Sequence, residues 1–180
     1  MSLTQKKRAR MIANCYAKWN IHGKKVVDIG CGNGVVSEIL KEKLNLDLCG
    51  ADIIDYCKIK MPFRKIDKAD RLPFDDLSFD YAMFNDVLHH IEDIEASIIE
   101  ANRIARNILI FEDQPGRLLR VVDVALNYFY SPLMPRPLNF KNREQWCLLF
   151  DRLGFKYDIV EAVYPFWYPF RHMAFRLKKT

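Results

Sequence analysis

The sequence predicts an α/β domain in which helices cover a mostly parallel sheet. Three observations carry this prediction. Strand-like and helix-like segments alternate along the chain, a turn with three glycines follows the first strand, and two segments near the C-terminus alternate apolar with polar residues. The chain has 180 residues, no internal repeat and no long linker, so we expect a single domain over 1–180.

The first strand and helix frame the glycine turn. Residues 25–29 (KVVDI) form a short apolar run that ends at Gly30, which suits a buried parallel strand. The next apolar residues recur at helical spacing: Val36, Ile39, Leu40 and Leu44. We therefore predict a strand, a glycine turn and a helix in this order.

The middle of the chain repeats the pattern. Residues 46–53, 79–86 and 107–113 read as strands, and a helix before the last of them is predicted from Ile91, Ile94, Ile98, Ala101 and Ala105. Residues 54–78 are mostly loop, with one short strand near 64–67, because they hold two prolines and no long helical pattern. The helix between the second and third strands is thus shortened or absent.

The C-terminal third closes the domain. A largely buried helix is predicted over 117–130, and an irregular, proline-rich crossing follows it. Asn142 and Gln145 form a capping box that starts another helix, and Gly154 ends it. Residues 156–164 and 172–179 then predict an antiparallel hairpin, with an aromatic block over 164–170 that can serve as an apolar lid.

Composition limits the classes of function. Five scattered cysteines without a CxxC motif favour neither disulfides nor a zinc site, and they suit a cytoplasmic location. No apolar run approaches the ~20 residues that span a bilayer, and the N-terminus lacks the apolar core of a secretory signal. The net charge is +5, and the basic residues at 6–10 fit a solvated helix face better than a nucleic-acid or membrane patch.

The glycine turn predicts a ligand site. Glycines between a strand and a helix let a ligand approach the backbone, where helix N-terminal amides favour negative charge. The spacing of Gly30, Gly32 and Gly34 fits a dinucleotide fingerprint poorly, and no phosphate-binding GxxxxGK[ST] loop is present. Asp52 ends the next strand, where an acid can bind ribose hydroxyls. The residues therefore indicate a ligand that carries a nucleoside.

Three segments resemble class I S-adenosylmethionine (SAM)-dependent methyltransferases, in the small-molecule branch. "VVDIGCGNG" is similar to the first motif of that family, "ADI" (51–53) to its ribose-binding segment, and "LPFDDLSFDYAMFNDVLHHIED" (72–93) to a run of the common small-molecule branch. The matches come in the family order and cover 25–93. The resemblance implies a Rossmann-like sheet of seven mostly parallel strands, with the last strand antiparallel and helices on both faces.

The resemblance also implies a cofactor site for SAM. The glycines would line its methionine end with Asp28 holding the loop, Asp52 would take both ribose hydroxyls, Ile53 would flank the adenine, and Asn85 would meet the amino group. Lys68, followed by Ala69, stands where the family usually has the Asp that contacts the adenine, and Asp67 is one residue away. The full predicted set is Asp28, Gly30, Cys31, Gly32, Gly34, Asp52, Ile53, Lys68, Ala69 and Asn85.

Candidate catalytic groups follow the strand at 79–86. His89 or His90 can deprotonate an acceptor, since histidine titrates near neutrality; the alternative is that both fill space at a helix start. Adjacent helix positions diverge by about 100°, so this pair is not expected to bind a metal. Glu112 and Asp113 end another strand, where they either face the acceptor or cap a loop.

The sequence thus predicts a SAM-dependent methyltransferase for a small, apolar or aromatic acceptor, with no metal, no membrane span and no nucleic acid as main partner. Residues 1–22 and 114–142 would cover the acceptor, and Leu118, Tyr128, Phe129, Trp167 and Tyr168 would help to wall its cleft. Two alternatives stay open: a SAM-binding protein without catalysis, favoured by Lys68 and the thin segment after the second strand, and an RNA methyltransferase guided by the basic N-terminus.

Overall fold

A computed structural model describes residues 3–55, 57–115, 139–163 and 171–179. Its sheet has seven strands in the order β3-β2-β1-β4-β5-β7-β6. The strands are β1 (Lys25–Ile29), β2 (Asp47–Asp52), β3 (Phe63–Lys65), β4 (Phe79–Asn85), β5 (Ala105–Asp113), β6 (Phe155–Glu161) and β7 (His172–Lys179). β7 runs antiparallel to both β5 and β6, and the other pairs are parallel. The Rossmann-like sheet with an antiparallel last strand is therefore confirmed.

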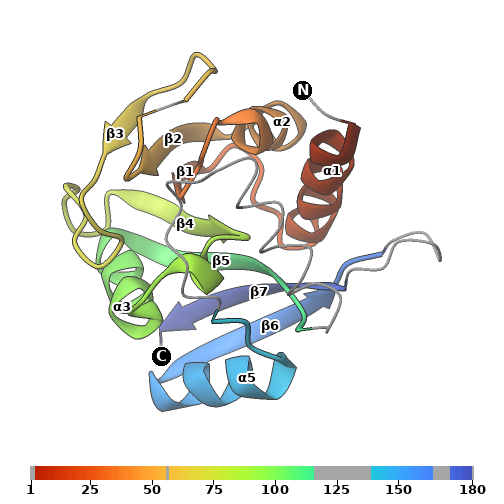
Figure 1. Cartoon of the computed structure of the whole chain (residues 1–180), viewed down its shortest axis with the longest axis vertical. Coiled ribbons are helices and arrows are strands. Elements are labelled where there is room, and N and C mark those ends of the chain that lie inside the picture. The colour runs from red at the N-terminus through yellow and green to blue at the C-terminus, as the bar shows by residue number, and fades with distance from the viewer. Residues whose placement is uncertain (1–2, 56, 116–138, 164–170, 180) are drawn as a thin grey trace.

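Helices pack on both faces of this sheet (Figure 1). The helices are α1 (Leu3–Ala17), α2 (Val35–Leu44), α3 (Ile94–Ile104) and α5 (Arg143–Arg152), with a short 3₁₀ helix, η1 (Leu88–His90). α1 and α2 bury their apolar residues with one face of the sheet, and α3 and α5 with the other. Neighbouring strand residues divide between the two cores because side chains alternate; Val26 joins the first core and Val27 the second.

Local sequence signals explain where the helices begin. Asn142 and Gln145 make the predicted capping box of α5, with each side chain bonded to the other's backbone amide. α3 begins later than predicted, because the Asp93 side chain accepts the amide of Ala96 and so caps the helix. Ile91 is extended and Ala105 already belongs to β5, so the predicted helix was too long at both ends.

The segment between β2 and β4 has no helix in its described residues, as predicted. The predicted helix over 117–130 and the aromatic block over 164–170 lie outside the described residues, together with their proposed pocket residues Leu118, Tyr128, Phe129, Trp167 and Tyr168. Among the helices that the structure describes, none has the length and apolar character to cross a membrane.

Candidate functional site

The glycine turn between β1 and α2 lies against neighbouring side chains. Gly30 and Gly34 both have positive φ, at 78° and 79°. A Cβ added to Gly30 would lie 2.3 Å from Cγ2 of Val87, and one added to Gly34 would lie 2.6 Å from Cγ1 of Ile59. Only glycine suits both the conformation and the space at these positions. The turn is therefore built so that the backbone itself forms the surface there.

Asp52, the last residue of β2, ties the glycine turn to its own strand. One carboxylate oxygen accepts the Gly32 amide at 2.7 Å, and the other accepts the Ile54 amide at 3.1 Å. A carboxylate has about four lone-pair sites. Asp52 is thus fixed in place by two backbone donors and keeps capacity for two more.

A cavity of about 240 Å³ opens beside Asp52. Its apolar walls include Ile53, Ile66 and Val87. Six of the predicted site residues line it: Gly30, Asp52, Ile53, Lys68, Ala69 and His90. The remaining six predicted residues, Asp28, Cys31, Gly32, Gly34, Asn85 and His89, are not part of its lining. The cavity therefore lies between Asp52 and the β3–β4 loop, and the predicted residues of the glycine turn other than Gly30 lie outside it.

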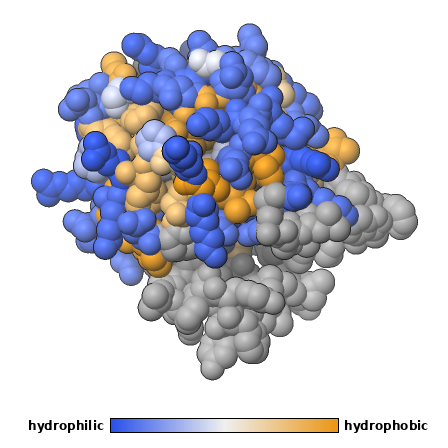
Figure 2. Space-filling model, turned by 90° about the horizontal axis from the view of Figure 1, so that it is seen from above, coloured by the Kyte–Doolittle hydropathy of each residue, from blue (hydrophilic) through white to orange (hydrophobic). Residues whose placement is uncertain are grey.

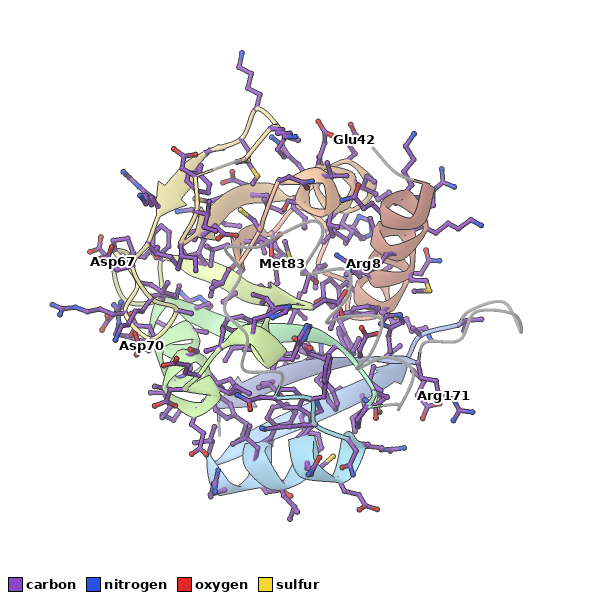
Figure 3. The ribbon with its side chains drawn as sticks, viewed as in Figure 1. Arg8, Glu42, Asp67, Asp70, Met83 and Arg171 are labelled. Atoms are coloured by element: carbon purple, nitrogen blue, oxygen red, sulfur yellow. The ribbon has the colours of Figure 1, made fainter. Side chains whose placement is uncertain are left out.

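Two acids of the β3–β4 loop border the cavity. Asp67 and Asp70 both line it, and Figure 3 shows them on the loop at the outer edge of the sheet. Asp67 was considered in place of Lys68, whereas Asp70 was missed by sequence reasoning. The signal that could have found it is an acid one residue after Ala69, on a segment already expected to be loop. Among the described residues on the face in Figure 2, hydrophilic ones predominate, with patches of hydrophobic residues between them.

Asp28 joins three elements below the glycine turn. Its carboxylate accepts the hydroxyl of Ser37 in α2 at 2.6 Å and the side-chain amide of Asn85 at 3.1 Å. The side-chain oxygen of Asn85, Oδ1, in turn accepts a hydrogen bond from the hydroxyl of Tyr16 in α1 at 2.8 Å. Burial raises the pKa of Asp28 to about 7, although both hydrogen bonds oppose that shift. This network fixes the side chain of Asn85 and links α1 to the turn.

Cys31 is a packing residue of the turn. Its side chain is buried, and its sulfur would lie 2.8 Å from a Cβ added to Gly50 on β2. Burial raises the pKa of the Cys31 thiol far above its usual range. The thiolate that a nucleophile requires is therefore strongly disfavoured.

Glu112 organises the loop after β4. One of its oxygens accepts the amides of Val87 and Leu88, at 2.9 and 2.7 Å, and the other lies 2.7 Å from Nδ1 of His89. Glu112 is 1% exposed and His89 is 3% exposed. The His89 ring stacks on Phe140 with ring centres 4.6 Å apart. Of the two sequence interpretations of Glu112, loop capping is the one that these contacts support.

Comparisons with known proteins identify the family and the shared fold. A family model described as a methyltransferase domain matches residues 4–160. A solved protein of Pyrococcus horikoshii is 19% identical, with a TM-score of 0.76, 99% of this chain and 93% of that chain covered. A SAM-dependent methyltransferase of Thermotoga maritima, titled a possible histamine N-methyltransferase, is 17% identical, with a TM-score of 0.70 and coverages of 99% and 92%. No curated protein sequence matches the chain.

A third solved structure carries the cofactor. Phosphoethanolamine N-methyltransferase 2 of Haemonchus contortus, in complex with S-adenosyl-L-methionine, is 14% identical, with a TM-score of 0.71; 94% of this chain and 52% of that chain are covered. At these identities the structural matches show a shared fold. The family match covers most of the chain, so the chain belongs to the methyltransferase domain family, and it is an enzyme that uses SAM.

Proposed function

We propose that the protein transfers the methyl group of SAM to a small, apolar or aromatic acceptor. The observation that carries this proposal is the position of the Asp52 carboxylate and its unused hydrogen-bonding capacity. It borders the cavity, two backbone amides fix it, and it keeps capacity for two further donors, which is what a ribose with two hydroxyls requires. Ile53 and Ile66 give the cavity the apolar walls that suit an adenine ring.

The chain's own residues would hold SAM along the carboxyl ends of three strands. The backbone of Gly30, Gly32 and Gly34 would line its methionine half, while Asp28 holds Asn85 in position from below. Asp67 or Asp70 would accept the adenine amino group in place of the acid that Lys68 replaces, since both acids border the cavity. Lys68 and Ala69 would then contact the adenine with their backbone.

Bound SAM supplies a methyl group that its sulfonium has already activated. The protein must align the acceptor with that methyl and exclude water, which can contribute several kcal/mol. For an acceptor with a proton to lose, we assign the base to His89 ahead of His90. Glu112 holds Nδ1 of His89, so Nε2 is the ring atom that can take the proton.

The surroundings of His89 support an aromatic acceptor. The ring of Phe140 stacks on it, and the ring centre of His90 lies 4.1 Å from its own. A flat apolar molecule can extend this stack. Arg8 of α1 pairs with Asp86 on the side of the helix that faces the sheet, so this residue does not contribute to an exposed basic patch for nucleic acid. A cytoplasmic location remains part of this proposal.

The experiment combines cofactor titration with an acceptor screen. Calorimetry with S-adenosylhomocysteine tests the cavity, and radiolabelled SAM with a panel of phenols, amines, thiols and activated carbon acids tests the acceptor. On the acceptor found, His89→Gln should cut turnover at least about tenfold while cofactor affinity stays the same. His22→Gln, an exposed histidine, is the matched control. Parent turnover in His89→Gln and in His90→Gln would reject the proposed base, and transfer to RNA alone would reject the acceptor class.

A further inference from the structure

Four charged or titratable side chains meet at the carboxyl ends of β4 and β5. Arg8 comes from α1, Asp86 follows β4, Asp113 ends β5 and His172 begins β7. Oδ1 of Asp113 lies 2.5 Å from Nδ1 of His172, which is 4.0 Å from Oδ1 of Asp86. The side chains of Asp86 and His172 are 4% and 2% exposed. This acid–histidine cluster lies outside the cavity of Asp52.

Three carboxylate oxygens of this cluster have ion-pair contacts with Arg8 or His172 but no hydrogen bond of good geometry within the described residues. These three atoms are both carboxylate oxygens of Asp86 and Oδ1 of Asp113, in the part of the chain that the structure describes. Arg8 lies 3.3 Å from Oδ2 of Asp86 and compensates part of one charge. Two carboxylates, one of them almost fully buried, thus share one guanidinium and one titratable imidazole, and an additional cation would offset part of the cost of their burial. Oδ1 of Asp86 is the oxygen 4.0 Å from Nδ1 of His172, whereas Arg8 contacts Oδ2.

We propose that Asp86, Asp113 and His172 bind a divalent transition-metal cation. Each offers one ligand atom, and the three atoms lie within 4.8 Å of one another. One imidazole nitrogen with two carboxylate oxygens suits Mn²⁺ or Zn²⁺ better than Mg²⁺ or Ca²⁺, which prefer oxygen alone. Metal-bound carboxylates are usually held in orientation by a second polar group. Arg8, 3.3 Å from Oδ2 of Asp86, would do this for Asp86 while Oδ1 binds the cation.

The fold holds two of these ligands in register. Asp113 and His172 are opposite each other in the antiparallel pair of β5 and β7, and the ring of Phe111 stacks on His172 with ring centres 5.0 Å apart. Metal–ligand bonds of about 2.1 Å place neighbouring ligand atoms roughly 3.0–3.4 Å apart. Binding therefore needs the contact between Asp113 and His172 to open slightly and Nδ1 to release a proton.

The proposal departs from the expectation of no metal, which rested on sequence spacing. Positions 86, 113 and 172 share no motif, and only the sheet brings them together. The bound cation would lie beside the loop that carries His89. There it would hold an oxygen of the acceptor; this role rests on the proposed function, whereas the binding itself does not.

The test uses Mn²⁺ alone with the full chain. Free Mn²⁺ gives an electron paramagnetic resonance signal that binding removes, and one cation per chain is expected. Asp86→Asn, Asp113→Asn and His172→Gln should each weaken binding at least about tenfold. Asp158→Asn, an exposed acid that pairs with Arg176, should leave the affinity within about twofold. Circular dichroism of each variant confirms folding, and any one folded variant is sufficient.

Two outcomes would overturn the metal site. One is that neither Mn²⁺ nor Zn²⁺ binds stoichiometrically at millimolar concentration, which would make the cluster a buried ion-pair network. The other is unchanged Mn²⁺ affinity in the folded ligand variants. Titration of S-adenosylhomocysteine into the same samples separates this failure from failure of the proposed function, because the cofactor cavity does not include these residues.

Discussion

Replacing Glu112 tests the organisation of the loop after β4. Glu112→Ala leaves the half-buried amide of Val87 and the buried amide of Leu88 without their acceptor and removes the carboxylate beside His89. An unsatisfied buried donor costs about 1–3 kcal/mol, so loss of the Leu88 acceptor should lower the free energy of unfolding by about that amount, and the half-buried Val87 amide should add a smaller loss. That is a large part of the stability of a typical domain, about 5–15 kcal/mol.

Glu112→Gln is the informative partner of that variant. The Gln carbonyl oxygen can still accept both amides, so the loss should stay below about 1 kcal/mol. Its amide nitrogen would then donate to Nδ1 of His89, which moves the ring proton to Nε2 and removes the proposed base. Turnover should fall at least about tenfold while stability is kept.

Urea unfolding followed by tryptophan fluorescence measures both effects on stability. Glu161→Ala, an exposed acid that pairs with Arg143 at 3.6 Å, should change the free energy of unfolding by less than about 0.5 kcal/mol. Equal losses in Glu112→Ala and Glu112→Gln would refute the role of the oxygen that holds the amides. If Glu112→Ala were as stable as the parent protein, Glu112 would not stabilise the loop after β4 at all.

Three further predictions concern the cofactor site and the network below it. Asp52→Asn should weaken the binding of S-adenosylhomocysteine by roughly 2–3 kcal/mol in calorimetry. Asp47→Asn, at an exposed position at the start of the same strand, should leave this binding unchanged. Gly30→Ala should destabilise the fold more than Gly23→Ala in urea, because both glycines have positive φ but only Gly30 has a neighbour in the way. Asp28 has its pKa raised to about 7, so the folded state holds a proton that the unfolded state releases, and stability should fall by roughly 4 kcal/mol as pH rises from about 4 to 7. Asp28→Asn should make the stability measured by thermal melts nearly independent of pH between about 4 and 7. An unchanged pH dependence in this variant would contradict the raised pKa of Asp28.

The sequence predicted the elements that local physics determines. The capping box of α5 and the glycine turn act within a few residues, so their signals are complete in a short window. Asp93 had the same kind of local signal, yet the apolar spacing of Ile91 and Ala105 suggested a longer helix. Periodicity shows that a helix exists, whereas the cap decides where it begins.

The side-chain contacts of the site could not be predicted in the same way. Glu112 had two equal interpretations, because a carboxylate at the end of a strand can face a ligand or a neighbouring loop. His172 received no functional role from its sequence position. It reaches Asp113 because β7 runs antiparallel, so its first residue lies at the edge where the parallel strands end. Such meetings depend on the topology of the whole sheet.

The position of β7 also bears on how the chain folds as it is synthesised. β5 pairs with β4 on one side and with β7 on the other, and β6 pairs only with β7 in the described sheet. Ribosomes add residues in order, so β5 keeps an open edge until residues 172–179 have emerged. That edge includes Leu109, Ile110 and Phe111, all fully buried in the final fold. An exposed apolar strand edge invites pairing with other chains, so nascent chains that stop before β7 should aggregate or bind chaperones.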